Sequence, residues 1–408
     1  MNRIQILKNP ILNYAWGSYT AISGLLGETT PSSTPQAELW MGAHPKAPSL
    51  MESNGVWIPL KEAISKNPEE ILGRSVSKAF DQRLPFLFKV LAAEKPLSIQ
   101  THPDKIQAKK GFDRETRRHI PIDSPIRNYR DENHKPECLC AISPFWALCG
   151  FRKISEMIVL FEKSGLSSLK KEIADLKHRP DSKGMRDFLS HLLMMESLKR
   201  QKVIEEAITW AAPRVDDDPI ARWTILLCRE YPMDLGVIAP MYLNLISLSP
   251  GEALYLPAGM LHTYLKGTGI EVMANSDNVV RGGLTSKHVD VQELFEVIRF
   301  DEADVQILKA VPISGNESQF VTPAEEFALS VIVVNRHAPY LSAPNRSIEI
   351  LFCTHGSGAI KTAGDNSEIQ LQKGVSVVVP AAVCGYQVRG NLTLYKVRVP
   401  LSVEAKKA

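Results

Sequence analysis

Several common signatures are missing from this chain of 408 residues. No run of about 18 consecutive apolar residues occurs, so we expect no membrane-spanning helix. Residues 1–14 contain no long apolar stretch followed by a small-residue cleavage site, so we also expect no signal peptide. Six cysteines are present, but no two have the C-x-x-C spacing of a structural zinc site. These absences predict a cytoplasmic protein whose cysteines are reduced.

The chain also lacks a strong excess of charge of either sign. Its formal net charge is +3, whereas nucleic-acid-binding domains usually carry a concentrated basic face. Apolar residues make up 44% and charged residues 23% of the chain, which is the composition of a folded protein rather than a disordered one. We therefore expect no nucleic-acid or membrane partner, although a local pocket for a small anion is compatible with these numbers.

The spacing of hydrophobic residues changes twice along the chain. Short β-type runs such as 84–93 dominate the first 150 residues. Between about 155 and 228 the apolar residues recur at helical spacing, with Gly165 as one interruption. Strand patterns return from Tyr242 and continue to about residue 399. The sequence therefore predicts a mainly β fold with an α-helical insert.

Two segments in the C-terminal half resemble each other. The first runs from Gly251 to His262 with the pattern G-x5-P-x-G-x-x-H, which is the second motif of cupin barrels. The second runs from Gly374 to Gly385 with the pattern G-x5-P-x-A-x-x-G. This similarity predicts two related β-barrels. Because glycine replaces histidine in the second segment, we expect no metal ligands in the C-terminal barrel.

Four polar residues are candidates for a metal site. Gln100 and His102 lie two apart in an expected strand and would therefore face the same side. Glu137 follows Pro136, which restricts the backbone, and a buried carboxylate needs a lysine or a metal as its partner. Together with His262 these residues offer two imidazoles, a carboxylate and an amide oxygen, a set that suits zinc. Taken one at a time, each also fits a structural role.

Seven runs of sequence resemble the type I phosphomannose isomerase family, and they cover most of residues 14–152 and 240–290. The runs are Tyr14–Gly17, Glu38–Gly42, Leu97–Lys105, Asn133–Glu137, Ala147–Arg152, Glu271–Asn278 and Arg281–Lys287. The helical insert and the C-terminal region match mainly in order and size. The chain departs from the family at Ser286, where proline is usual.

This resemblance implies two cupin, or jelly-roll, β-barrel domains and a helical domain. We expect a discontinuous catalytic barrel over residues 1–153 and 238–300. The helical insert domain would occupy residues 154–237, and a cupin-like barrel without metal ligands would occupy residues 301–408.

The resemblance also implies an activity in mannose metabolism: a metal-dependent aldose–ketose isomerase that interconverts mannose 6-phosphate and fructose 6-phosphate. The implied ligands of one zinc ion per chain are Gln100, His102, Glu137 and His262. Arg281 is the implied catalytic cation and would stabilise the charge of an enediol(ate). For the base that moves the proton, His134, Lys135 and a metal-bound water remain open, as does a hydride shift in place of proton transfer.

The substrate implied here is a small sugar phosphate, whose phosphate needs cationic or hydroxyl partners. Ser98, Lys135 and Lys287 are candidates by their place in the matched runs. Other residues expected to bind the substrate or line the pocket are Trp16, Glu38, Lys89, Tyr264, Glu271 and Asp277. We expect the enzyme to be a monomer.

Two other functions fit the same pattern. One is a metal cupin that isomerises another sugar phosphate, such as glucose 6-phosphate. The other is a cupin that only binds a sugar, as a sensor or a storage protein. Arg281 and Lys287 favour an enzyme, because a sensor needs no second cation at the reacting carbons.

Overall fold

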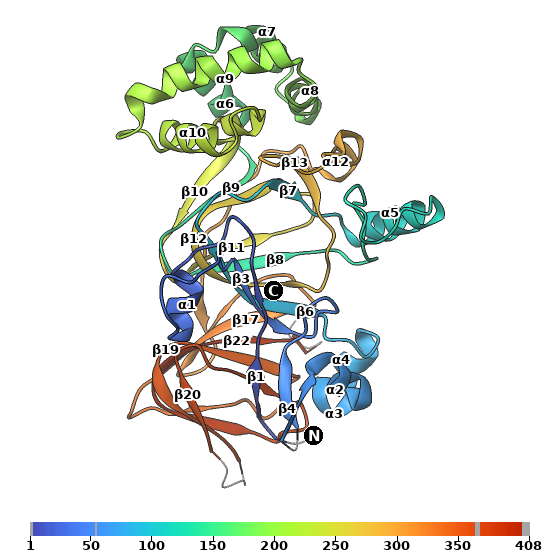
Figure 1. Ribbon diagram of the computed structural model, residues 1–408, viewed down its shortest axis with the longest axis vertical. Helices are drawn as coiled ribbons and strands as arrows, with labels where there is room; N and C mark the ends of the chain where they lie inside the picture. Colours follow the sequence, from blue (N-terminus) through green and yellow to red (C-terminus); the bar gives the residue numbers. More distant parts are fainter. Residues whose placement is uncertain (1–2, 54, 364–367, 402–408) are drawn as a thin grey trace.

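The computed structural model describes residues 3–53, 55–363 and 368–401. Figure 1 shows three tiers along the long axis: a group of helices at the top, a β-sheet in the middle and a second β-sheet at the bottom. Each sheet has 11 strands, and all of their strand pairs are antiparallel. The expectation of a mainly β fold with an α-helical insert is confirmed. None of the helices in the described ranges is long and apolar enough to cross a bilayer.

The middle sheet is organised around its longest strand, β12. This strand pairs with β6, β7, β8 and β9 and so joins segments from both halves of the chain. The strands of this sheet are β2 (Ile11–Leu12), β3 (Glu38–Gly42), β6 (Phe86–Ala93), β7 (Ile99–Thr101), β8 (Glu137–Ala141), β9 (Phe145–Phe151), β10 (Leu243–Leu248), β11 (Glu252–Leu256), β12 (His262–Ala274), β13 (Val280–Gly283) and β14 (Leu308–Lys309).

The bottom sheet contains strands from both ends of the chain. Strand β1 from the N-terminal segment pairs with β21 on one side and with β4 on the other. The strands of this sheet are β1 (Gln5–Lys8), β4 (Leu50–Ser53), β5 (Val56–Pro59), β15 (Val311–Pro312), β16 (Glu317–Phe320), β17 (Ala328–Val334), β18 (Tyr340–Leu341), β19 (Glu349–Thr362), β20 (Glu368–Gln372), β21 (Ser376–Val379) and β22 (Tyr386–Arg398).

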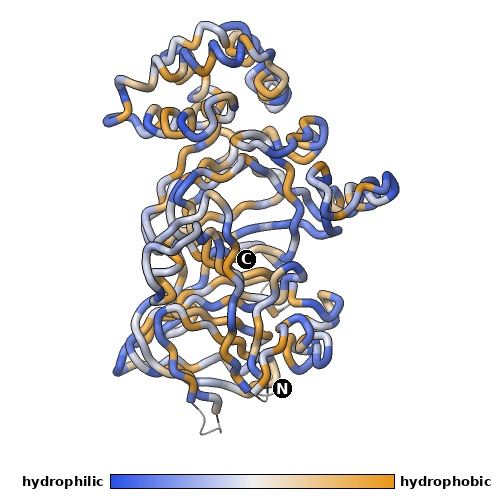
Figure 2. Tube along the Cα trace, in the orientation of Figure 1, coloured by the Kyte–Doolittle hydropathy of each residue, from blue (hydrophilic) through white to orange (hydrophobic). Residues whose placement is uncertain are grey.

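The helices of the top tier lie in the sequence between β9 and β10, which pair with each other in the middle sheet. They are α6 (Ile154–Ser164), α7 (Lys170–His178), α8 (Ser182–Leu193), α9 (Ser197–Ala211), α10 (Pro219–Glu230) and α11 (Ala239–Tyr242). Helix α6 ends where Gly165 adopts a left-handed conformation with φ of 67°, which glycine adopts without strain. Figure 2 shows hydrophobic and hydrophilic residues alternating along these helices, as expected of helices with one buried face.

The other α-helices of the described chain surround the two sheets. They are α1 (Ala21–Leu26), α2 (Leu60–Lys66), α3 (Pro68–Leu72), α4 (Arg74–Ala79), α5 (Lys105–Arg117) and α12 (Val291–Val297). Helix α5 directly follows the predicted ligand segment, and Asp104 and Gln107 form a reciprocal capping box at its start. This cap fixes where the chain leaves β7.

The tiers are held together by shared hydrophobic clusters. One cluster joins residues of the middle sheet, such as Phe88 and Cys140, to Phe352 and Tyr395 of the bottom sheet. Another joins Ile99 and other residues of the middle sheet to the helices of the top tier. The two sheets therefore share one cluster, in addition to a cluster that each sheet buries by itself.

The two similar segments have the same backbone conformation. Gly251 and Gly374 precede β11 and β21 with φ values of 89° and 90°. The likeness extends beyond the sequence pattern, because Gly267 in β12 and Gly390 in β22 have φ values of 132° and 129°. Both members of each pair adopt a conformation that favours glycine. The two segments therefore share their glycine conformations as well as their sequence pattern.

Candidate metal centre and substrate pocket

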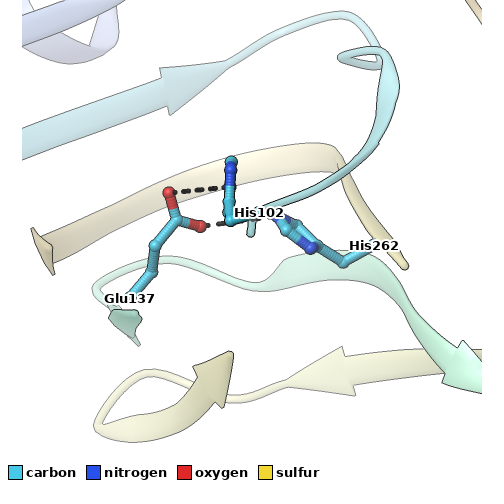
Figure 3. A group of neighbouring side chains, drawn as sticks. All are labelled: His102, Glu137 and His262. Carbon is cyan, nitrogen blue, oxygen red and sulfur yellow. Dashed lines mark ion pairs between the residues drawn. The ribbon is translucent and has the colours of Figure 1, made fainter. Parts of the chain in front are cut away.

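Three of the predicted ligands converge at one end of the middle sheet. His102 follows β7, Glu137 begins β8 and His262 begins β12. The Nε2 atoms of His102 and His262 lie 3.3 Å and 3.4 Å from the two carboxylate oxygens of Glu137, and Figure 3 shows the three side chains pointing toward one another. All ligand atoms lie within 4.8 Å of one another. This spacing leaves room for one shared metal ion.

The backbone sets the orientation of both imidazole rings. His102 Nδ1 donates to the carbonyl of Asn278 at 2.8 Å, and His262 Nδ1 donates to the carbonyl of Met260 at 2.9 Å. A carbonyl can only accept, so each Nδ1 carries the proton and each Nε2 keeps a free lone pair. Both Nε2 atoms are buried without a hydrogen-bond partner. Outer hydrogen bonds of this kind are what metal-binding histidines usually make.

Electrostatics keep these groups in the forms that a metal requires. Burial lowers the pKa of His102 to about 4, and nearby Lys135 adds to the decrease, so the imidazole is neutral at pH 7. Burial opposes ionisation of Glu137, but Lys135 and His102 outweigh it and hold the pKa of this carboxyl well below its usual value. Lys135 Nζ lies 2.9 Å from Glu137 Oε1. The site therefore offers one carboxylate and at least one neutral imidazole.

The fourth predicted ligand, Gln100, lies beside this group. Its backbone pairs with His262 on one side and with Arg281 of β13 on the other. Gln100 and Glu137 both line a cavity of about 550 Å³. The strand pairing therefore brings an amide and a guanidinium to the edge of the candidate metal centre.

The same cavity is lined by all of the residues predicted to bind the substrate. Of the residues predicted from sequence, those that line it are Trp16, Glu38, Lys89, Ser98, Gln100, Lys135, Glu137, Tyr264, Glu271, Asp277, Arg281 and Lys287. They come from β3, β6, β7, β8, β12, β13 and the loops between them. The two imidazoles lie behind this surface and are almost completely buried.

A buried ion-pair network lies in the wall of the cavity. Lys89 Nζ lies 3.1 Å from Glu38 Oε1 and 2.6 Å from Glu271 Oε2, and Tyr264 donates to Glu271 at 2.7 Å. Burial alone would lower the pKa of Lys89, but Glu271 and Glu38 raise it above its usual value. Lys89 therefore keeps its positive charge, which makes it unsuited to act as a base at neutral pH.

The structure does not bring His134 into the cavity. Its Nε2 lies 2.6 Å from Glu326 Oε1, in the segment that precedes β17. The adjacent Lys135 does line the cavity. Consecutive residues in extended backbone point to opposite sides, so only one of these two base candidates reaches the site.

Several lining residues were not predicted from the sequence. They are Tyr14, Lys46, Arg127, Asn128, Arg130 and Tyr231. Tyr14 and Arg130 adjoin or belong to matched runs, which was the available signal. Tyr231 follows α10, and no local pattern could have placed a residue of the helical insert at this cavity.

Comparisons with known proteins agree with this geometry. The family model described as "Phosphomannose isomerase type I, catalytic domain" matches residues 4–154. The model described as "Mannose-6-phosphate isomerase, cupin domain" matches residues 316–399.

Similarity to individual proteins extends over almost the whole chain. The mannose-6-phosphate isomerase of Escherichia coli (strain K12) is 39% identical over 398 residues, which are 97% of this chain and 99% of that protein. The Homo sapiens mannose-6-phosphate isomerase is 32% identical, and the matched region comprises 91% of this chain and 92% of the human protein. A zinc-bound mannose 6-phosphate isomerase structure superposes with a TM-score of 0.89 at 35% identity, covering 98% of this chain and 100% of that one.

Proposed function

The chain belongs to the type I phosphomannose isomerases, and from that membership and the geometry of its site we propose that it interconverts mannose 6-phosphate and fructose 6-phosphate with one bound zinc ion. The observation that carries this proposal is the group of His102, Glu137 and His262, whose metal-facing atoms are buried and lack hydrogen-bond partners. Buried polar atoms without partners are rare in folded proteins unless a ligand satisfies them.

The donor set fits zinc. Two imidazole nitrogens, a carboxylate oxygen and the amide oxygen of Gln100 are hard or borderline ligands, and no thiol is needed. When bound, zinc supplies a positive charge that polarises the sugar oxygens at C1 and C2. The protein contributes the orientation of both rings through the carbonyls of Asn278 and Met260.

We assign separate roles to the cations around the site. Arg281 is proposed to stabilise the negative charge that develops on the sugar oxygens, because its strand neighbour Gln100 belongs to the ligand set. Lys135 is proposed to move the proton between C1 and C2, because its amine reaches the cavity while His134 is bonded to Glu326. As a cation paired with Glu137, Lys135 must first give up a proton before it can act as the base. Lys89 is proposed to hold Glu38 and Glu271 in place for hydrogen bonds with the sugar hydroxyls.

The substrate contacts and the organisation of the chain are also part of this proposal. Ser98, Lys287, Tyr264, Asp277 and Trp16 are proposed to contact the substrate, since they line the same cavity. The catalytic domain is proposed to comprise residues 1–153 and 238–300, with a helical domain over 154–237 and a C-terminal domain over 301–408. We further propose a cytoplasmic monomer, which fractionation and analytical ultracentrifugation can test.

The activity is tested by coupling the formation of fructose 6-phosphate to a downstream dehydrogenase. Purified protein should convert mannose 6-phosphate, lose this activity after treatment with a chelator and regain it when zinc is added. Glucose 6-phosphate is the control substrate. Preference for glucose 6-phosphate, or binding of mannose 6-phosphate without turnover, would contradict the proposal.

The ligand assignment is tested by metal analysis. Wild-type protein should contain about one metal per chain, because the residues form a single set of four ligands. A His102→Ala/His262→Ala double variant should fold but contain almost none. Stoichiometric metal in this variant would show that the metal binds elsewhere.

A further inference from the structure

Four cationic side chains line the substrate cavity without an anionic partner. They are Lys46, Arg130, Arg281 and Lys287. Within the described ranges, no carboxylate forms an ion pair with any of them. The other three cations of the cavity differ, because Lys89 is paired with Glu38 and Glu271, Lys135 with Glu137 and Arg127 with Glu115. The cavity therefore has a neutralised region near the metal centre and a region of uncompensated positive charge.

These four side chains lie close enough to influence one another. Burial lowers the pKa of Lys287, and repulsion from Arg281, Arg130 and Lys46 lowers it further. Burial and Arg130 likewise lower the pKa of Arg281. Like charges held together in this way destabilise the empty site and favour a bound anion.

The nearest acidic side chains already have other partners. Asp277 also lines the cavity, but its Oδ2 lies 3.5 Å from His44 Nε2. Asp131 is next to Arg130 in sequence, yet its carboxylate accepts hydrogen bonds from Ser276 Oγ and from the backbone N–H groups of Asn133 and Asp277. The positive region is therefore open to an anion from solution.

The backbone of Arg130 is fixed relative to the metal centre. Its N–H donates to the side-chain oxygen of Asn278 at 2.7 Å, and the carbonyl of Asn278 accepts from His102 at 2.8 Å. Asn278 is fully buried, and its amide also donates to the carbonyls of Asp131 and Asn133. One residue thus connects a metal ligand to the backbone that carries Arg130.

We propose that Arg130 is a further phosphate-binding residue, which together with Lys287 fixes the phosphate end of the sugar at a set distance from the metal centre. This inference rests on the proposed function and adds a residue that determines specificity for a phosphorylated sugar. The planar guanidinium can donate two parallel hydrogen bonds to phosphate oxygens, which a lysine cannot do. Arg281, beside Gln100, faces the reacting carbons instead.

The test compares Arg130→Gln and Arg130→Lys with Arg118→Gln, a control that removes an exposed arginine near the same loop. Inorganic phosphate is the probe, and its binding is measured by calorimetry and by competitive inhibition. In Arg130→Gln, KM for mannose 6-phosphate and the dissociation constant of phosphate should both rise by on the order of 10- to 100-fold, the loss expected for hydrogen bonds to a charged group. Turnover at saturation should stay within about threefold, because the contact is equally strong in substrate and transition state.

Arg130→Lys should recover part of the affinity, and Arg118→Gln should match wild type. The inference is overturned if phosphate binding and KM in Arg130→Gln stay within about twofold of wild type, or if only kcat falls. Phosphate calorimetry does not depend on turnover. If wild type fails to isomerise mannose 6-phosphate but phosphate binding still depends on Arg130, the proposed function fails and the anion site stands.

Discussion

At the scale of single residues, the site is defined by which polar atoms have partners and which do not. The Nδ1 atoms of His102 and His262 are bonded to carbonyls, while their Nε2 atoms are unbonded and face Glu137. Similarly, Lys89 is paired with two carboxylates, whereas no carboxylate in the described part of the chain forms an ion pair with Arg281. The type of a residue therefore indicates little about its role in the site, whereas the partners of its polar atoms indicate that role.

Arg281 should affect turnover more than binding. If it stabilises charge that develops only during the reaction, Arg281→Ala should lower kcat by on the order of 100- to 1,000-fold with a small change in KM. Arg281→Lys should restore part of the rate, because the charge remains but the planar fork does not. Steady-state kinetics on protein of verified metal content measure this. Turnover within about threefold of wild type in Arg281→Ala would exclude a catalytic role.

Lys396 in the bottom sheet should contribute strongly to stability. It is 2% exposed, and its Nζ lies 2.8 Å from Glu317 and 3.3 Å from Glu349. Lys396→Met would leave Glu317 buried without its cation and Glu349 with only Arg346, at 3.7 Å, and should destabilise the protein by about 3–5 kcal/mol. Lys266→Met is the control, because the exposed pair between Lys266 and Glu94 should contribute about 0–1 kcal/mol. Urea unfolding that gives equal losses would disprove the difference.

At the scale of elements, strands β12 and β22 play equivalent parts in the two sheets. Each follows a proline-led turn and contains a glycine with φ near 130° five residues after the equivalent positions His262 and Gly385. In β12 the first residue, His262, is a proposed metal ligand, whereas at the equivalent position before β22 Gly385 has no side chain to offer. The two segments have similar backbones, but only the segment in the middle sheet carries a side chain that could bind a metal.

Two of these glycines, Gly390 and Gly251, allow a matched test of backbone and packing effects. At Gly390 an added Cβ would lie 2.4 Å from Gly358 Cα and 2.6 Å from Ser357 O, whereas at Gly251 it would meet nothing within 4 Å. Both residues have positive φ, so alanine at either should add about 1–3 kcal/mol of backbone strain. Gly390→Ala should be more destabilising by a further 1–3 kcal/mol, roughly the effect of overpacking. Thermal unfolding compares the two, and an equal loss would show that the strand relaxes around the added methyl group.

At the scale of the whole molecule, the two sheets depend on each other. The N-terminal strand β1 lies in the bottom sheet beside β21, although most of the N-terminal half belongs to the middle sheet. The cluster that contains Phe88 also contains Phe352 and Tyr395. His134, one residue before Lys135, is bonded to Glu326 in the C-terminal part. The bottom sheet therefore supports the loop that carries a catalytic candidate.

A fragment that ends at residue 300 should not fold stably. It would lose β21, one of the two partners of β1, and expose the apolar surface around Phe88 and Cys140, for which burial contributes roughly 25 cal/mol per Å². We expect the fragment to aggregate or to lack a cooperative thermal transition, while the full chain unfolds in one transition. Calorimetry and metal analysis provide the measurement. A soluble fragment with about one metal per chain would show that the catalytic domain is independent.

The sequence by itself determined the chemistry of the candidate metal centre and the local elements. Residue type and spacing suggest the candidate ligands, and the resemblance to a known family groups them. Turns and helices follow from short-range patterns such as the segment that begins at Gly251 and the end of α6 at Gly165. These features depend on interactions between residues close together in the chain, which is why they can be read locally.

Only the tertiary structure decided which distant residues meet. His134 contacts Glu326, Tyr231 and Arg130 reach the cavity, and β1 pairs with β21. Each of these arrangements depends on contacts between segments far apart in sequence. Strand pairing and side-chain partners of this kind are set by the packing of the whole chain, and periodicity within one segment carries no information about them. The charge of each cation was known from the sequence, but the folded chain decided which of them kept a partner.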